Sequence, residues 1–116
     1  MIADEITAHE AEDDPRNQHI LIYVDGKIVP RSEAKVSVYD SGFMLGDGVW
    51  EGLRFYNGTW AFLDEHIKRL YEAAKAIDLD INLNEVELIA ALEKTRLANR
   101  ITKDAHARVM VTRGIK

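Results

Sequence analysis

"VWEGLRFYNGTWAFL", residues 49 to 63, decides the fold, because hydrophobic and polar residues alternate on both sides of an Asn57-Gly58 pair. Such a pair between two alternating runs is a strong signal for a two-residue β-turn, so we expect a hairpin of strands 49–56 and 59–63. An Asp25-Gly26 pair within "HILIYVDGKIVP" (19–30) predicts a second hairpin by the same argument. Two hairpins indicate an antiparallel sheet.

The strand before this turn has two unlike faces, because successive side chains of a strand point to opposite sides. One face carries Val49, Glu51, Leu53 and Phe55, and the other carries Trp50, Gly52, Arg54 and Tyr56. A glycine inside a strand gives up packing, which fits either a bulge or a close approach of another group to the backbone. Gly52 therefore marks either a bulge beside an exposed arginine or the floor of a pocket walled by Trp50 and Arg54. Such a pocket would suit an apolar substrate that carries a carboxylate.

The residues after the hairpin change from a period of two to a period of 3.6, which predicts a helix from Asp64, with Asp64 or its neighbour as N-cap. Its apolar stripe consists of Ile67, Leu70, Tyr71, Ala74 and Ile77. Asn84 is a suitable cap for a second helix over about 85–99, whose apolar contacts are Leu88, Ile89, Leu92 and Leu97. Residues 31–42 read as extended and irregular, and 42–48 as a single turn or loop between glycines. We predict a two-layer α+β domain, an antiparallel sheet with two helices packed on one face.

The last stretch, "DAHARVMVTRG" (104–114), alternates again and predicts a final strand. His106 and Arg108 share one face of it, about 7 Å apart from two steps of strand rise. This pair is either an anion-binding site or the polar face of a terminal strand, and the spacing alone leaves both open.

The segment "FLDEHIKRL" (62–70) offers a second cation. Arg69 follows Glu65 by four residues, the favourable order for an ion pair on a helix surface. On a helical wheel Arg69 faces away from the apolar stripe, and His66 lies at its flank. We therefore expect a surface ion pair, unless something outside this chain covers that side of the helix.

Composition limits the remaining classes of function. The 116 residues, 47% hydrophobic, suffice for one domain, and their net charge is −5. Residues 1–14 hold six acids and no base, so we interpret 1–17 as a mobile acidic arm and 18–116 as the folded domain. An acidic balance without a basic stripe argues against a nucleic-acid partner. No cysteine is present, which excludes a disulfide framework, a thiolate metal site and a cysteine nucleophile; together with the lack of a long apolar run, this predicts a cytoplasmic protein with no membrane partner and no metal site.

Four stretches in order, "YVDGKIV", "DSGFMLGDGVWEGLRFYNG", "FLDEHIKRL" and "ARVMVTRG", resemble the small N-terminal domain of the class IV (fold type IV) pyridoxal-phosphate aminotransferases. The resemblance covers about residues 20 to 114. It implies that Arg69, the arginine of the HxxR motif, contacts the phosphate of pyridoxal 5'-phosphate. A guanidinium suits that role because its planar fork binds two phosphate oxygens and stays charged.

The resemblance also implies which residues face the substrate. These are Leu45, Trp50, Gly52, Arg54, His106 and Arg108. Leu45 stands where the family often has Tyr, and His106 where branched-chain enzymes tend to have Tyr. "GFMLGDGV" is closer to D-amino acid aminotransferases and "WEGLRFY" to branched-chain aminotransferases, so the substrate and its stereochemistry stay open.

Transamination with this cofactor needs a lysine that forms the Schiff base. The chain has seven lysines, and none lies in a matching context. In the family that lysine belongs to a later C-terminal domain, so we expect a fragment without a catalytic residue of its own and inactive alone. The resemblance further implies a homodimer, with the apolar flank 43–50 as part of the assembly surface. Two alternatives remain: an aminodeoxychorismate lyase of the same family, or a non-enzymatic assembly or anion-binding module.

Overall fold

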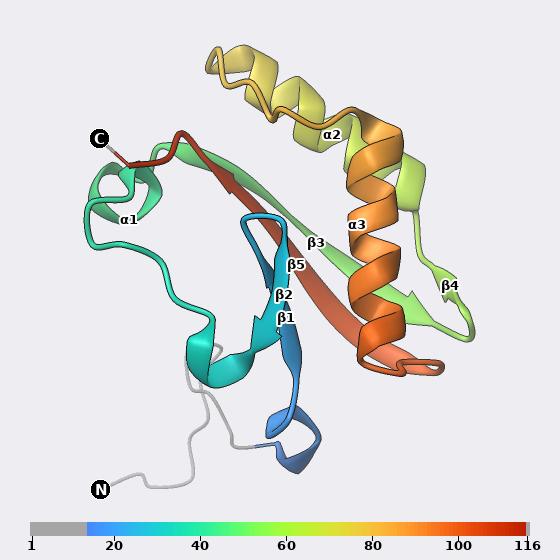
Figure 1. Ribbon diagram of the computed structural model, residues 1–116. Coiled ribbons are helices and arrows are strands. Elements are labelled where there is room, and N and C mark those ends of the chain that lie inside the picture. The colour runs from blue at the N-terminus through green and yellow to red at the C-terminus, as the bar shows by residue number, and fades with distance from the viewer. Residues whose placement is uncertain (1–13, 116) are drawn as a thin grey trace, which may run out of the picture.

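The computed structural model describes residues 14–115, which form eight regular helices and strands and two 3-10 turns (Figure 1). The helices and strands are β1 (Leu21–Val24), β2 (Lys27–Pro30), α1 (Ser41–Leu45), β3 (Gly48–Tyr56), β4 (Thr59–Trp60), α2 (Leu63–Ala76), α3 (Glu85–Ala98) and β5 (Asp104–Thr112). The 3-10 turns are Pro15–Asn17 and Arg31–Glu33. Most of the predicted acidic arm, residues 1–13, lies outside the described residues.

Both hairpins form, but they belong to separate sheets. β1 pairs with β2 alone, while β3 lies between β4 and β5 in a three-stranded antiparallel sheet. The expectation of one sheet is therefore wrong. The pairing of β3 with β5 runs without interruption from Gly48 opposite Thr112 to Tyr56 opposite Asp104. No bulge occurs at Gly52, which removes one of its two interpretations.

Two helices cover one face of the three-stranded sheet, as the sequence predicts. Ile67 and Leu70 of α2 and Leu88 of α3 share a buried cluster with Val49 of β3 and Val109 of β5. Burial of such side chains contributes roughly 1.5–3 kcal/mol each, so this cluster holds the layers together. In Figure 1 the two helices lie at an angle to each other beside the long β3 and β5 strands. The α+β class is thus confirmed.

The helix ends differ in part from the prediction. Asn84 caps α3 as expected, and its side chain and that of Glu87 form a reciprocal capping box. The α2 helix begins one residue early, at Leu63, and its N-cap is Phe62 with a left-handed φ of 53° and no side-chain cap. Asp64 instead lies in the first turn, where its charge favours the helix dipole. The turn at Phe62 also ends β4 at Trp60, which shortens the predicted 59–63 strand.

Two residues predicted to be apolar contacts are largely in solvent. Ile77 follows the last residue of α2 and is 38% exposed, and Leu97 is 62% exposed near the end of α3. Each lies where its helix runs past the sheet, so periodicity alone overestimates the buried stripe. None of the helices in residues 14–115 is long and apolar enough to cross a membrane.

Residues 41–45 form the short helix α1 where the sequence suggests a turn or loop. The Asp40 side chain accepts hydrogen bonds from the Gly42 amide and from the Thr112 hydroxyl, which fix α1 beside the end of β5. Gly46 ends the helix with a φ of 67°, a conformation that glycine adopts at low cost. As a result, Phe43, Met44 and Leu45 project into solvent.

Candidate functional site

The most unusual side chain of β3 is Glu51. The alternation of the strand points it toward α2, between the buried Leu53 and the half-buried Val49, and only 7% of the residue is exposed. An ionised carboxylate in such a place is costly unless it is paired. A single acid on an otherwise hydrophobic strand face is the one sequence signal that marks this position, and the sequence analysis assigned Glu51 no role.

Two side chains of α2 pair with this carboxylate. The Arg69 guanidinium donates from Nη2 to Glu51 Oε1 at 2.6 Å and from Nε to Oε2 at 2.9 Å, and His66 Nδ1 lies 2.7 Å from Oε1. We call these three residues the Glu51 cluster. The hydrogen bond from Arg69 lowers the pKa of Glu51 despite its burial, and the carboxylate in turn raises the pKa of Arg69.

The expected surface pair between Glu65 and Arg69 is wrong. Arg69 turns across the sheet edge to Glu51, because a buried carboxylate gains more from a cation than an exposed one does. His66, expected only at the flank of the apolar stripe, is 23% exposed at its side chain and contacts the same carboxylate.

The geometry at Arg69 leaves one edge of its guanidinium open. A guanidinium carries five N–H donors in a planar fork. Within the described part of the chain, the hydrogen bonds of Arg69 involve Nε and Nη2, and none involves Nη1. The side chain is 67% exposed although its inner edge is held by Glu51. The terminal edge can therefore bind a second anion from solvent.

The opposite face of β3 and β5 is exposed and carries five of the predicted site residues. Gly52 lies opposite Arg108 and Arg54 opposite His106. The Arg108 guanidinium carbon stacks 4.8 Å from the centre of the Trp50 ring, which is 57% exposed. We call this surface, formed by Trp50, Gly52, Arg54, His106 and Arg108, the basic aromatic face.

Gly52 is needed here for close approach. A Cβ atom at this position would lie 3.2 Å from both Cε1 and Nε2 of the His106 imidazole, and 3.8 Å from the Trp50 ring. The missing side chain is thus replaced by the ring of His106 from the neighbouring strand. Arg54 faces the other way, with its guanidinium 5.0 Å from the Tyr56 ring and 3.4 Å from the Asp104 carboxylate.

The predicted site residues therefore fall into three places. The basic aromatic face holds five of them, while Arg69 lies with Glu51 at the helix-covered side of the same strand. Leu45 lies in α1, 62% exposed, shortly before β3 begins. Residues 48 to 53 of β3 have a strand partner only on the β5 side, so both groups border an open strand edge.

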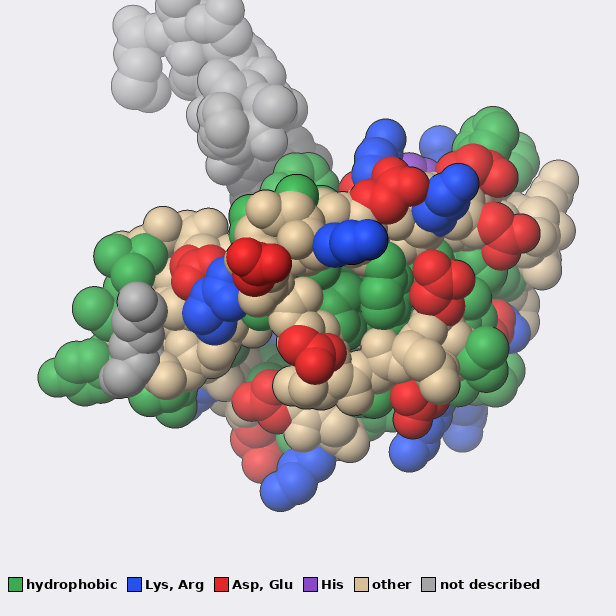
Figure 2. Space-filling model, turned by 90° about the horizontal axis from the view of Figure 1, so that it is seen from above, with side chains coloured by type: hydrophobic (Ala, Val, Ile, Leu, Met, Phe, Trp, Pro, Cys, Tyr) green, Lys and Arg blue, Asp and Glu red, His purple; other side chains and the backbone are tan. Residues whose placement is uncertain are grey.

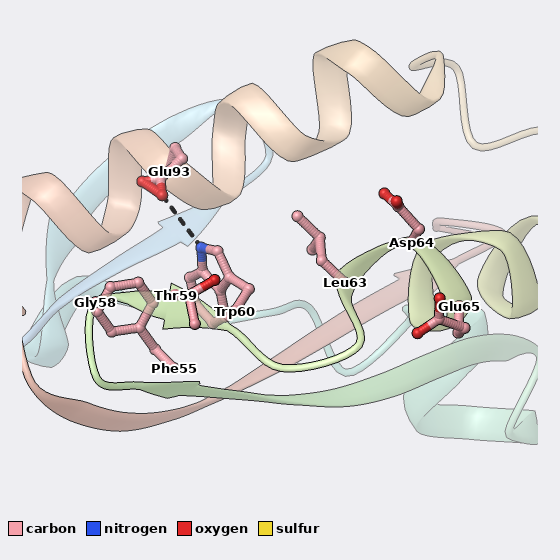
Figure 3. Close-up of a pocket in the computed structure, with 8 residues that line it drawn as sticks. All are labelled: Phe55, Gly58, Thr59, Trp60, Leu63, Asp64, Glu65 and Glu93. Carbon is pink, nitrogen blue, oxygen red and sulfur yellow. Dashed lines mark hydrogen bonds between the residues drawn. The ribbon is translucent and has the colours of Figure 1, made fainter.

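A groove elsewhere on the chain contains none of these residues. It lies beside β4 and the first turn of α2, and Figure 3 shows its lining of Phe55, Gly58, Thr59, Trp60, Leu63, Asp64, Glu65 and Glu93. The Trp60 indole donates to Glu93 at 3.2 Å, and Glu93 also accepts from Arg96. These contacts join β4 to α3 and give the groove a structural explanation.

Replacing Gly52 with valine is expected to expel the His106 ring from the basic aromatic face while changing the free energy of unfolding by less than about 1 kcal/mol. The strand gains a residue of higher β propensity, and the exposed imidazole can rotate away. The proton chemical shifts of the His106 imidazole should change clearly. Gly52→Ala, with one carbon instead of three, is the matched control and should shift them less. Identical His106 signals in the valine variant would contradict this account of Gly52.

Comparison with known proteins gives one consistent result. The sequence profile of the class IV amino-transferases matches residues 48–116. A Methanocaldococcus jannaschii protein named "Putative branched-chain-amino-acid aminotransferase" is 47% identical over 94 residues, which are 81% of this chain and 32% of that protein. The D-alanine aminotransferase of Bacillus licheniformis is 40% identical over 93 residues, 80% of this chain and 32% of that enzyme.

A solved structure agrees with the sequence matches. The branched-chain amino acid aminotransferase from the organism abbreviated T.th., complexed with N-(5'-phosphopyridoxyl)-L-glutamate, superimposes with a TM-score of 0.76 at 31% identity. The match covers 84% of this chain and 34% of that one. The chain thus spans about a third of the length of the relatives it matches.

Proposed function

The chain belongs to the class IV aminotransferases, and from this premise we propose that it is the small N-terminal domain of a pyridoxal-phosphate enzyme. That enzyme would transfer an amino group between an amino acid, of branched-chain or D-amino acid type, and a 2-oxo acid. The observation that carries the proposal is the Glu51 cluster, which holds a guanidinium at a strand edge with its terminal donors open to an anion. The names of the matched relatives support the amino acid classes.

Arg69 would hold the cofactor through its phosphate. A phosphate dianion needs fixed, charged donors, and the terminal edge of Arg69 provides two of them in one plane. Glu51 already neutralises one positive charge here, so further donors from outside this chain are needed to balance a dianion. The bound cofactor supplies an electron sink for the carbanion that forms at the amino acid Cα.

The basic aromatic face would form the substrate wall. Arg108, Arg54 and His106 offer positive or hydrogen-bonding groups to a carboxylate, and Trp50 offers an apolar surface to a side chain. Gly52 would keep the backbone accessible, and Leu45 would contribute an apolar contact from α1. Their separation from Arg69 suits a complex whose phosphate and reacting carbon lie at different ends.

The proton transfer and the covalent link to the cofactor would be performed by a lysine outside residues 1–116. None of the seven lysines here lies in the sequence context that the family uses. We therefore propose that the 116 residues alone are inactive and act only with the rest of the protein. A cytoplasmic location, and small molecules rather than nucleic acid or membranes as partners, are supported by the lack of cysteine and the net charge of −5.

Assembly as a homodimer is part of the proposal. Hydrophobic side chains protrude at the end of the molecule that carries the C-terminus, as the green groups at that end of Figure 2 illustrate. The most exposed are Phe43 at 70%, Leu45 at 62% and Ile115 at 72%. An exposed apolar surface of this kind is typical of an interaction site.

The test of the function is an assay of the full-length protein loaded with pyridoxal 5'-phosphate. Leucine, valine or D-alanine with 2-oxoglutarate should give the matching 2-oxo acid and glutamate in equal amounts. The 116-residue chain, assayed in parallel, should give none. Pyruvate released from aminodeoxychorismate without any amino acceptor would favour a lyase instead, and no reaction with either set would contradict the proposed activity.

A further inference from the structure

We propose that Glu51 is a positioning residue: it holds the Arg69 guanidinium by its inner edge so that the terminal edge faces the cofactor phosphate. The inference rests on the proposed phosphate role of Arg69. It assigns a purpose to a buried carboxylate that neither the cofactor nor the substrate would touch.

The hydrogen-bond pattern fixes the orientation of the guanidinium. Glu51 accepts from Nε and Nη2 of Arg69, at 2.9 and 2.6 Å, which occupies the side edge of the planar group. A second bidentate anion can then bind only along the Nη1–Nη2 edge. The carboxylate thus selects one of the two edges that an unrestrained arginine would offer to a phosphate.

Glu51 is a rigid anchor and Arg69 alone is not. The Glu51 side chain is 9% exposed and lies on a strand whose pairing with β5 is continuous, and His66 contacts the same carboxylate from α2. The Arg69 side chain is 67% exposed and carries substantial rotamer entropy when free. Holding it before the ligand arrives moves that entropy cost from binding to folding, which strengthens binding.

The charge of Glu51 makes the inference testable by sign. A carboxylate near a phosphate repels it. If Glu51 were only a neighbouring charge, its removal would tighten the binding of a phosphorylated ligand. If Glu51 positions Arg69, its removal weakens binding although a repulsion is lost.

The experiment is a titration of the full-length apoprotein with pyridoxal 5'-phosphate, followed by absorbance and tryptophan fluorescence rather than by turnover. Glu51→Ala should raise the dissociation constant about tenfold, the lower end of losses seen when groups that orient a ligand-binding side chain are removed. Glu51→Gln keeps an oxygen that accepts from Arg69 and should bind only about two- to threefold more weakly than wild type. The nitrogen-15 signal of Arg69 Nε should move toward solvent-like values in the alanine variant.

Glu93→Ala is the matched control, because Glu93 also accepts from an arginine Nε on α3, with Nε of Arg96 at 2.8 Å, yet it lies beside the separate groove. It should reduce stability and leave cofactor affinity unchanged. Equal or tighter binding by Glu51→Ala, when Arg69→Ala binds weakly, would overturn the positioning role and leave the proposed function intact. If Glu51→Ala does not fold, tighter binding by Glu51→Gln would overturn it as well. Undiminished binding by Arg69→Ala would instead reject the phosphate role of Arg69.

Discussion

Replacing Phe55 with alanine is expected to lower the free energy of unfolding of the chain by about 4 kcal/mol. Phe55 is 2% exposed in β3, and its ring meets that of Trp60 edge to face, with centroids 5.1 Å apart. On its other side the Arg96 guanidinium carbon lies 4.6 Å from the ring centre. The substitution would therefore leave a cavity at the point where β3, β4 and α3 meet.

The loss should exceed that of an isolated buried phenylalanine for a structural reason. Arg96 also donates to the Ile101 carbonyl and to Glu93, so its stacking on Phe55 links the end of α3 to the sheet. Chemical denaturation followed by circular dichroism measures the effect. Phe43→Ala removes the same atoms from a side chain that is 70% exposed, and it should cost less than about 1 kcal/mol. Equal losses for the two variants would contradict the described core.

The hairpins could be predicted from sequence because their determinants are local. Asn57 and Gly58 adopt φ values of 53° and 79°, and Asp25 and Gly26 adopt 49° and 84°. Two consecutive left-handed residues define the turn that matches the twist of antiparallel strands. Few residue pairs tolerate that conformation, so the pair itself reveals the turn.

The separation into two sheets could not be predicted in this way. Which strand pairs with β3 depends on contacts more than fifty residues apart, such as Gly52 with Arg108, and no local pattern encodes them. The start of α2 also differs from the prediction, because the left-handed Phe62 follows from how the chain leaves β4 and not from a capping side chain. Tertiary geometry overrides local preference at both places.

The candidate site shows the same division. Alternation correctly places Trp50, Gly52 and Arg54 on one face, because a strand has a fixed period. The i,i+4 rule wrongly pairs Arg69 with Glu65, because it considers only the helix. Glu51 is 18 residues from Arg69 in sequence, and their contact depends on the docking of α2 against β3. Burial of that carboxylate, which the sequence does not reveal, decides the pairing.

Replacing Arg69 with alanine is expected to weaken the binding of pyridoxal 5'-phosphate to the full-length protein by roughly 2 kcal/mol or more, about 30-fold. The variant loses a charged donor pair that faces the phosphate and leaves the buried Glu51 paired with His66 alone. Its carboxylate then adds repulsion where attraction existed. Cofactor dissociation, followed by dialysis and absorbance, measures the effect.

Two further variants separate the geometry of Arg69 from its charge. Arg69→Lys keeps the charge but has no planar fork, so it cannot engage Glu51 and phosphate along separate edges; we expect it to recover less than half of the lost binding free energy. Lys68→Ala removes the neighbouring exposed cation of α2 and should retain near wild-type affinity. If Lys68→Ala lost as much affinity as Arg69→Ala, the general positive charge of the helix would explain binding. Full recovery by lysine would mean that charge alone suffices, and the fork held by Glu51 would then have no part in holding the phosphate.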